Sequence, residues 1–297
     1  MNNKIIWTQW TLSQKMRNAT YEINHYGDKD FKTVTPPSHD FYELYYFIGG
    51  RASYIVENKK YQLRHGDLLL IPPGELHQLD MTDSSQLYER IVLWITPRYL
   101  RALGTGRTDL TECFRLCAES RAYLIRDISF AEKIGTWLDE TFARSAASRY
   151  GDDLRAEILL KNIFLELCRY TRSRRAPESG ISHAAVTQAI DYIAAHLTED
   201  LSLDVLADQL YLNKYYLARL FREQTNVTLH QYILKKRLSL ARSFIEQGLP
   251  IAQVCQRSGF HDYTNFFRAF KNEYGMTPGQ YHALYGQPSP PGDAGQP

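Results

Sequence analysis

The sequence has few cysteines, no long apolar run and no excess of either charge. Four cysteines in 297 residues do not make a disulfide framework, and buried free thiols in a reducing compartment are the simpler interpretation. The first residues lack the apolar core and cleavage site of a secretory signal. No stretch approaches the roughly 20 apolar residues of a membrane span. We therefore expect a cytoplasmic protein with no membrane partner.

The overall charge is also uninformative about a nucleic-acid partner. Lys and Arg total 35 against 33 Asp and Glu, for a net charge of +2. The hydrophobic content of 44% is enough to fill ordinary globular cores. At roughly 150 residues per domain, the length suggests about two domains. Any DNA binding must be argued from local patterns.

The first third of the chain reads as strands. Turn signals such as Gly49-Gly50 and Pro72-Pro73-Gly74 separate short segments rich in Tyr, Ile, Leu and Val at 53–56, 61–64, 67–71 and 90–95. Short strands with frequent turns predict an antiparallel barrel or sandwich over about 20–97.

The spacing of apolar residues becomes helical after Pro97, over about 98–172. One stripe is Phe130, Ile134, Trp137, Leu138 and Phe142, and the next is Leu154, Ile158, Leu159, Asn162, Ile163, Leu165, Glu166 and Leu167. The second helix could pack on the barrel, on a partner subunit or on both. We expect 1–172 to bind an effector and dimerise, 173–182 to be a linker and 286–297 a disordered tail.

The last hundred residues contain an internal repeat. Segments 217–232 and 266–281 are related by an offset of 49, with identities at Arg219/Arg268, Phe221/Phe270, Thr228/Thr277, Gln231/Gln280 and Tyr232/Tyr281. Asn226 pairs with Gly275, and both residue types tolerate a left-handed helix C-cap. These matches predict a duplicated unit within 183–285.

Each copy follows a short amphipathic segment, at 202–210 with Ser202 as N-cap and at 251–258. A tight turn comes next in both, and Asn213 can cap the helix after the first turn. Two short helices joined by a tight turn, the second carrying basic residues, predict a helix-turn-helix.

The second helix of each copy has an apolar face and an outward stripe. The outward residues are Tyr215, Ala218, Arg219 and Arg222 in the first copy, and Thr264, Phe267, Arg268 and Lys271 in the second. Arg219 and Arg268 suit bidentate contacts with guanine, whereas Lys214, Arg222 and Lys271 suit phosphates. For Phe267 two interpretations stand, burial against a neighbouring helix and contact with a thymine methyl group. Between the copies, 229–247 predicts one helix of about 28 Å, which can hold two reading heads roughly one DNA turn apart.

The C-terminal region resembles the AraC/XylS family of bacterial transcription regulators. The resemblance covers about 195–285 and is carried by Leu206-Ala207, Tyr216-Leu217-x-Arg219-Leu220-Phe221, Arg237-Leu238-x-x-Ala241, Gly259-Phe260, Phe266, Phe270-Lys271, Gly275, Thr277-Pro278 and Tyr281. It implies base reading by Tyr215, Ala218, Arg219, Tyr263, Thr264, Phe267 and Arg268. It also implies a homodimeric regulator of double-stranded DNA, expected to be an activator and not an enzyme, with RNA polymerase as a further candidate partner.

The N-terminal region carries two motifs that look like the cupin barrel. One is His39-x3-Glu43 followed by Gly49, and the other is Gly66-x5-Pro72-x-Gly74-x2-His77. Metal-binding cupins carry a further His two residues after the first, where this chain has Phe41. On a strand, His39, Phe41 and Glu43 would share one face.

The three polar residues His39, Glu43 and His77 could converge in the barrel. Hydrogen bonding to an organic effector, with Tyr42 and Trp94 as aromatic walls, is the favoured interpretation, and a sugar is the first candidate effector. A divalent metal on the three residues and a purely structural role are the alternatives, and we expect no resident cofactor. The predicted fold is therefore α+β multidomain: an N-terminal cupin-like antiparallel β-barrel with trailing helices, then an all-α domain of two helix-turn-helix units joined by a linker helix. The rival functions are a metal-dependent cupin enzyme fused to a DNA-binding domain and an effector-independent regulator with a vestigial barrel.

Overall fold

The computed structural model describes residues 16–29, 38–83, 85–146, 149–173 and 183–286. The chain divides into two compact units, Met1–Ser182 and His183–Pro297. Most of the predicted linker 173–182 and nearly all of the predicted tail 286–297 lie outside the described residues. No helix in these ranges is long and apolar enough to cross a membrane.

The first unit contains two antiparallel sheets. One has the strand order β1-β7-β2-β5-β8 and the other β4-β3-β6. The strands are β1 (Tyr21–Asp28), β2 (Tyr42–Gly49), β3 (Arg51–Val56), β4 (Lys59–Gln62), β5 (Leu68–Ile71), β6 (His77–Asp83), β7 (Tyr88–Ile95) and β8 (Leu124–Ile125). Register pairs Glu43 of β2 with Trp94 of β7 and Val56 of β3 with His77 of β6.

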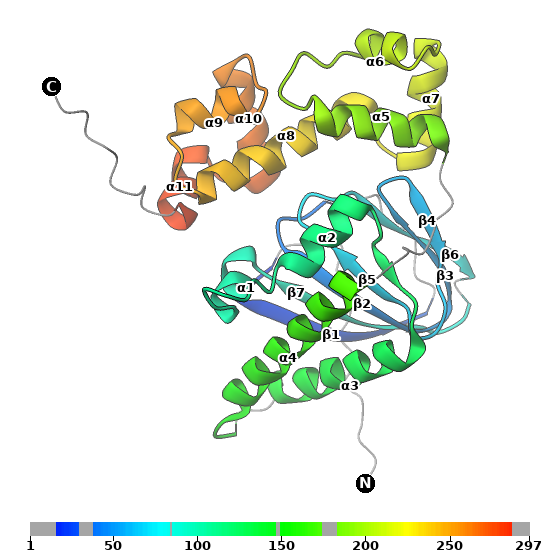
Figure 1. Ribbon diagram of the computed structural model, residues 1–297, viewed down its shortest axis with the longest axis vertical. Coiled ribbons are helices and arrows are strands. Elements are labelled where there is room, and N and C mark those ends of the chain that lie inside the picture. Colours follow the sequence, from blue (N-terminus) through cyan, green and yellow to red (C-terminus); the bar gives the residue numbers. More distant parts are fainter. Residues whose placement is uncertain (1–15, 30–37, 84, 147–148, 174–182, 287–297) are drawn as a thin grey trace, which may run out of the picture. The chain divides into compact units, whose positions relative to one another are not determined.

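Alternation along the strands separates two cores. Tyr45, Val92 and Trp94 point with side chains of the smaller sheet, such as Tyr54 and Val56, into an aromatic interior. Leu44, Ile91 and Leu93 belong to a second core that also contains side chains of the helices. These helices are α1 (Pro97–Leu103), α2 (Glu112–Ser120), α3 (Ile128–Ser145) and α4 (Asp152–Ser173), and Figure 1 shows α2, α3 and α4 on one side of the larger sheet.

The segment 98–172, predicted to be helical, contains one exception and one misassigned face. Strand β8 interrupts the helices, because Leu124 and Ile125 pair with β5 and fill the core. Leu154 and Ile158 were expected on the apolar stripe of α4, but their exposed fractions are 60% and 47%. The buried stripe of α4 is rotated about the helix axis relative to the predicted one. It consists of Ala156, Leu159, Leu160, Ile163, Phe164, Leu167 and Cys168.

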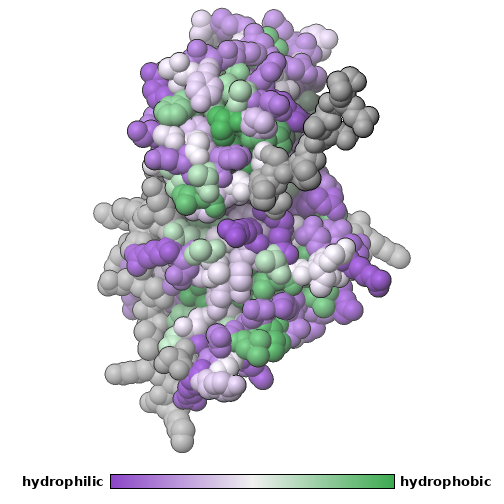
Figure 2. Space-filling view, turned by 90° about the vertical axis from the view of Figure 1, so that its left-hand side faces the viewer, coloured by the Kyte–Doolittle hydropathy of each residue, from purple (hydrophilic) through white to green (hydrophobic). Residues whose placement is uncertain are grey.

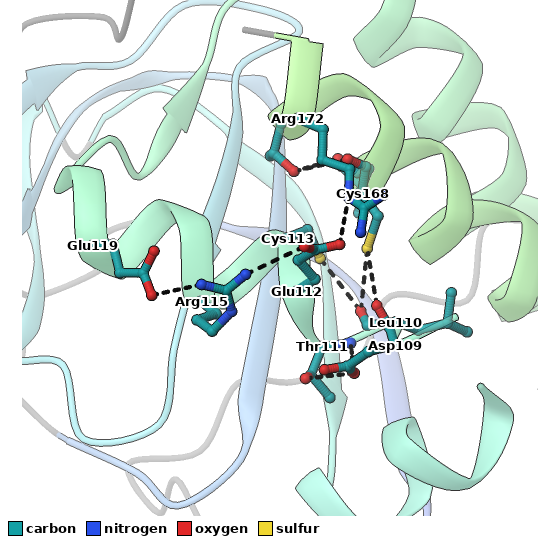
Figure 3. Close-up of polar contacts among 11 residues, drawn as sticks. Asp109, Leu110, Thr111, Glu112, Cys113, Arg115, Glu119, Cys168 and Arg172 are labelled. Atoms are coloured by element: carbon teal, nitrogen blue, oxygen red, sulfur yellow. Dashed lines mark hydrogen bonds and ion pairs between the residues drawn. The ribbon is translucent and has the colours of Figure 1, made fainter. Parts of the chain in front are cut away.

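The C-terminal end of α4 forms hydrogen bonds with α2 and with the residues just before α2 (Figure 3). The thiols of Cys113 and Cys168 both donate to the carbonyl of Leu110, at 3.6 and 3.5 Å. Glu112 accepts from Arg172 at 2.6 Å and from Arg115 at 3.2 Å. All four cysteines of the chain are buried and free. The apolar contacts hold the orientation of α4, because exposed ion pairs contribute little.

The second unit is entirely helical in its described residues. Its helices are α5 (Ala184–Ala195), α6 (Leu203–Gln209), α7 (Lys214–Thr225), α8 (Leu229–Glu246), α9 (Ile251–Arg257), α10 (Tyr263–Tyr274) and α11 (Pro278–Tyr285). One cluster joins Leu238, Ala241 and Ile245 of α8 to Phe266 and Phe270 of α10. The predicted fold class is confirmed: an antiparallel β-domain with trailing helices, and a separate helical domain.

Candidate DNA-binding helices and effector site

Helices α6 and α7, like α9 and α10, are short pairs joined by tight turns. Ser202 caps α6, and Asn213 caps α7 by accepting from the backbone N–H groups of Tyr215 and Tyr216, at 2.9 and 3.3 Å. Asp262 caps α10 by accepting from the backbone of Asn265. These side chains satisfy backbone donors that no carbonyl within the helix can reach, so each helix begins at a defined residue.

The ends of α7 and α10 are as similar as their starts. Asn226 and Gly275 both have left-handed backbones, with φ of 58° and 74°. Each is followed by a capping box that starts the next helix, Thr228 with Gln231 for α8 and Thr277 with Gln280 for α11. The repeat seen in the sequence is therefore a repeat of capping chemistry.

The buried face of each second helix matches the prediction. Leu217, Leu220 and Phe221 of α7 are buried, and so are Phe266 and Phe270 of α10. The opposite face carries the predicted DNA-contacting stripe: Tyr215, Arg219 and Arg222 are exposed on α7 and Ala218 is half-buried, while Tyr263, Thr264, Phe267, Arg268 and Lys271 are exposed on α10. Phe267 has 36% of its surface exposed, which opposes the alternative that it is buried against a neighbouring helix.

The charged residues of the two stripes have different local partners. Lys214 donates to Asp204 of α6 at 2.8 Å, and this hydrogen bond raises the pKa of Lys214. Arg268 donates to the side chain of Asn265, one turn earlier on α10, at 2.7 Å. The guanidinium of Arg219 lies 5.9 Å from the ring centre of Tyr216. All three cations are accessible, so they can meet phosphates or base edges.

Helix α8 connects the two pairs. Its 18 residues span about 27 Å. Tyr232, Ile233, Leu238, Ala241 and Ile245 form its buried face, as the sequence predicted. Sequence reasoning missed the position of Arg237, which donates to the carbonyls of Leu197 and Glu199 at 2.9 and 2.6 Å. Through these bonds α8 satisfies carbonyls beyond the end of α5.

In the first unit, the structure brings His39, Glu43 and His77 together. One ligand atom from each lies within 4.8 Å of the others, and all three side chains are buried. His39 precedes β2, which begins at Tyr42, whereas Glu43 lies on β2 and His77 begins β6. The cluster is therefore built where the two sheets meet, although His39 is not on a strand as expected.

Glu43 accepts three hydrogen bonds in this buried position. Trp94 Nε1 donates to one carboxylate oxygen at 2.8 Å, and the hydroxyl of Tyr54 donates to the other at 3.2 Å. His39 Nε2 lies 3.2 Å from the first oxygen. Burial favours the protonated acid, but the hydrogen bond with His39, the charges of the two histidines and the bond from Trp94 lower the pKa of Glu43 to about 2.

Of the two predicted aromatic walls, Trp94 belongs to the cluster and Tyr42 does not. Trp94 shares the interior face with its register partner Glu43. Tyr42 is the neighbour of Glu43 on β2 and therefore points to the opposite face, where its ring stacks on Phe114 at 4.4 Å. Tyr54 and Phe41 contact the cluster instead: the ring of Phe41 stacks on His39 at 3.9 Å. Alternation along β3, which turns Ala52, Tyr54 and Val56 to the interior, could have identified Tyr54.

A second polar feature of the interior was missed. Arg90 is 2% exposed, forms an ion pair with Asp28, and lies over the rings of Tyr26 and Tyr88 at 4.7 and 4.3 Å. The hydroxyls of Tyr45 and Tyr88 are hydrogen-bonded, and burial raises the pKa of Tyr88 to about 12. The interior thus presents tyrosine hydroxyls and the guanidinium of Arg90 in addition to the cluster of His39, Glu43 and His77.

Comparison with known families divides the chain as the structure does. A family described as "AraC-like ligand binding domain" matches residues 22–164, and one described as "Helix-turn-helix domain" matches 206–283. The transcriptional activator RhaR of Escherichia coli is 24% identical over 269 residues, covering 84% of this chain and 87% of RhaR. The probable transcriptional regulator LumQ of Photobacterium leiognathi is 39% identical over 92 residues, covering 31% of this chain and 37% of LumQ.

ToxT of Vibrio cholerae with bound unsaturated fatty acid is 18% identical, covers 91% of this chain and 98% of ToxT, and has a TM-score of 0.41.

Proposed function

The chain is a member of the AraC/XylS family of transcription regulators, with an N-terminal effector domain and a C-terminal DNA-binding domain, and we propose that it activates transcription as an effector-controlled homodimer. The two exposed stripes on α7 and α10 carry this proposal. In each stripe an arginine is flanked by uncharged side chains above a buried apolar face, which suits insertion in the major groove. Activation is proposed from the similarity to the transcriptional activator RhaR, and it implies contact with RNA polymerase.

DNA reading is tested by gel shift on DNA upstream of the chain's own gene. Arg219→Ala and Arg268→Ala should each cost about 1–3 kcal/mol of discrimination at separate base pairs. Arg219→Lys keeps the charge but loses the bidentate fork, so base preference should relax while the salt dependence stays. Arg257→Ala, on α9 and exposed outside the stripe, is the matched control. If neither arginine of the stripes affects preference, the recognition helices are wrongly assigned.

Effector binding is proposed for the aromatic interior between the sheets. Trp94 and Tyr54 border the cluster of His39, Glu43 and His77, and a polyhydroxyl ligand such as a sugar pairs well with aromatic faces and a few buried polar groups. A sugar at 100 times its Kd should stabilise the protein by about 2.7 kcal/mol in a thermal-shift screen. If no ligand in a broad screen stabilises it while DNA binding is intact, an effector-independent regulator is favoured.

Dimerisation is proposed through the outer face of α4. Leu154 and Ile158 are exposed one turn apart, and the opposite face of α4 is fully packed on the first unit. Exposed large apolar side chains occur elsewhere as well, and Figure 2 shows apolar patches interspersed with polar surface. Sedimentation should show a dimer that Leu154→Glu with Ile158→Glu dissociates, whereas Ile128→Glu on α3, equally exposed, leaves it intact. A dimer unaffected by the double variant would exclude this interface.

A further inference from the structure

The thiols of Cys113 on α2 and Cys168 on α4 converge on one backbone oxygen of the first unit (Figure 3). Their sulfur atoms lie 3.6 and 3.5 Å from the carbonyl oxygen of Leu110. The sulfur of Cys168 also lies 3.7 Å from the carbonyl oxygen of Asp109. A carbonyl oxygen has two lone pairs and can accept from both thiols. The two sulfur atoms are therefore neighbours, although the helices that carry them are far apart in the sequence.

The shared carbonyl is fixed by the turn that precedes α2. The carboxylate of Asp109 accepts from the backbone N–H and from the hydroxyl of Thr111, at 2.9 and 2.7 Å. Such a turn holds the backbone around Leu110 in one conformation. The side chains of Leu110, Cys113 and Cys168 are buried in one core. The two thiols are therefore held close together before any oxidant arrives.

The two thiols differ in how readily they lose a proton. Burial raises the pKa of Cys113 well above the usual range of a thiol. The pKa of Cys168 is lowered, because the Cys113 thiol can turn its hydrogen from the carbonyl of Leu110 to the thiolate of Cys168. The thiolate is the nucleophilic form of a cysteine. Cys168 is therefore the group that reacts first, and Cys113 keeps its proton until a second step.

Cys168 also lies nearer to solvent, beneath an exposed ion pair. Cys113 is fully buried, whereas Cys168 has 5% of its surface exposed. Arg172, one turn later on α4, and Glu112 of α2 lie beside Cys168 and are joined at 2.6 Å (Figure 3). The side chain of Arg172 is mostly exposed, and ion pairs of this kind open at little cost. When this pair opens, a molecule as small as hydrogen peroxide can reach the sulfur of Cys168, while Cys113 stays in the core.

We propose that Cys113 and Cys168 form an oxidation site for hydroperoxides, at which the two thiols become a reversible disulfide between α2 and α4. In the first step the thiolate sulfur of Cys168 attacks one oxygen of hydrogen peroxide. The S–O bond forms, the O–O bond breaks, and the leaving hydroxide takes up the proton that Cys168 lost and becomes water. Cys168 is then a sulfenic acid.

The second step closes the disulfide. The sulfur of Cys113 attacks the sulfenic sulfur of Cys168, the S–S bond forms and the S–O bond breaks. The leaving hydroxide departs as water with the proton of Cys113. Over both steps the two thiols are oxidised and the peroxide is reduced to two molecules of water. A dithiol reductant restores both thiols by exchange.

This site goes beyond the proposed function, because it is complete within the first unit and needs neither effector nor DNA. A disulfide in a reducing compartment is usually transient and responds to an oxidant. The bridge would join α2 covalently to α4, the helix that also carries the proposed dimer face. If no disulfide forms, the gel-shift and thermal-shift tests above still decide the proposed function.

The test maps the disulfides of the full-length protein. The reduced and desalted protein is treated with hydrogen peroxide under native conditions, the remaining thiols are alkylated in denaturant, and the peptides are identified by mass spectrometry. We expect one linked pair of peptides, with Cys113 and Cys168, while Cys117 and Cys255 are alkylated. The melting temperature should rise by roughly 5–15 °C, since the bridge restricts the unfolded chain. Dithiothreitol should reverse both changes.

Two single variants separate the roles of the thiols. In Cys113→Ser, the oxidation of Cys168 should stop at the sulfenic acid, which dimedone traps as an adduct of increased mass. In Cys168→Ser, Cys113 should remain a thiol, because it is fully buried and protonated. Cys117→Ser, buried on the same helix as Cys113, is the matched control and should form the same disulfide as the wild type.

Several outcomes would overturn the proposal. A bridge between Cys113 and Cys117, a bridge between two chains, or a wild-type protein that forms no disulfide would each do so. A folded Cys113→Ser variant in which Cys168 gives no dimedone adduct would show that Cys168 is not the reacting thiol. If a variant does not fold, as judged by circular dichroism, the peptide map and the melting temperature of the wild type decide.

Discussion

The two helix-turn-helix units share their capping chemistry and differ in their turns and outer faces. Helices α7 and α10 both have 12 residues, begin after an Asn or Asp cap and end at a left-handed residue. Between the short helices, however, the first turn runs from Tyr211 to Asn213 and the second from Gly259 to Asp262, one residue longer. Local hydrogen bonds thus fix the residues at which α7 and α10 begin and end. The length of the turn before each helix and the residues of its outward stripe differ between the two units.

Each of the two turns contains one residue with a left-handed backbone, but the space around that residue differs between them. Tyr211 has a φ of 54° and is 95% exposed, so its side chain lies almost entirely in solvent. Gly259 has a φ of 82°, and a Cβ there would lie 2.8 Å from the carbonyl of Leu197 and 2.9 Å from Arg237 Nε. The first turn therefore has a left-handed residue with room for a side chain. The second turn has no such room, because Gly259 packs against the hydrogen bond between Arg237 of α8 and Leu197 after α5.

The largest expected effect would test this difference in packing. Gly259→Ala should lower the free energy of unfolding by about 2–4 kcal/mol, since it adds left-handed strain and a backbone clash. Tyr211→Ala places the same residue at a similar φ in the open turn and should change stability by less than about 0.5 kcal/mol. Urea denaturation followed by circular dichroism measures both. Equal effects would show that the two turns are equivalent after all.

The next effect concerns how each arginine is positioned. Asn265 holds Arg268 at 2.7 Å, whereas the corresponding residue of α7 is Tyr216, whose ring lies beside Arg219. Asn265→Ala should weaken base preference at the second half of the DNA site by about 1 kcal/mol, because the guanidinium loses an orienting bond. Asn272→Ala, exposed on the same helix, is the control. Binding assays with single base-pair substitutions should place the loss where Arg268→Ala places it, and a loss spread over the whole site would argue against positioning.

Removing the N-cap of α7 should cost nearly the same stability as removing that of α10, which would sharpen the comparison of the two units. Asn213→Ala and Asp262→Ala should each cost about 1 kcal/mol of stability, since each exposes backbone donors at a helix start. Asp262→Asn keeps the hydrogen bond and removes the charge, so it isolates the helix-dipole contribution of a few tenths of a kcal/mol. Thermal denaturation measures all three. A much larger loss of stability at one cap would mean that the two caps share their geometry but not their contribution to stability.

The helical unit could be predicted well from sequence because its determinants are local. Ser202, Asn213, Asn226 and Gly275 act through residues two to four positions away, and periodicity alone separates Leu217 and Phe221 from Arg219. The stripe of Phe267 and Arg268 followed from the same rotation of 100° per residue. Contacts at this range need no knowledge of the rest of the fold.

The β-unit was harder because its site depends on which face of each strand is inside. Tyr42 and Trp94 looked equivalent, yet one side chain lies beneath the helices and the other beside Glu43. The choice is decided by the pairing of β2 with β7, residues about 50 positions apart in sequence. The outward positions of Leu154 and Ile158 depend likewise on how α4 packs, so a broad apolar helix did not reveal its buried side.

The smallest expected effect concerns the acid beside the first recognition helix. Lys214 is hydrogen-bonded to Asp204 at 2.8 Å, while the corresponding start of α10 is the uncharged Tyr263. At this position, therefore, the first unit must release an ion pair to contact a phosphate, and the second unit has no cation. Asp204→Asn should free Lys214, tighten DNA binding by roughly two- to fivefold at low salt, and steepen the plot of log K against log salt by about one ion. The stability should hardly change, because the pair is exposed. Asp208→Asn, on the same helix but without a hydrogen bond to Lys214, should have a smaller effect on affinity and leave the slope nearly constant. If the two variants act alike, general charge reduction near α7 accounts for the gain, and the proposed asymmetry between the two reading heads does not extend to their phosphate contacts.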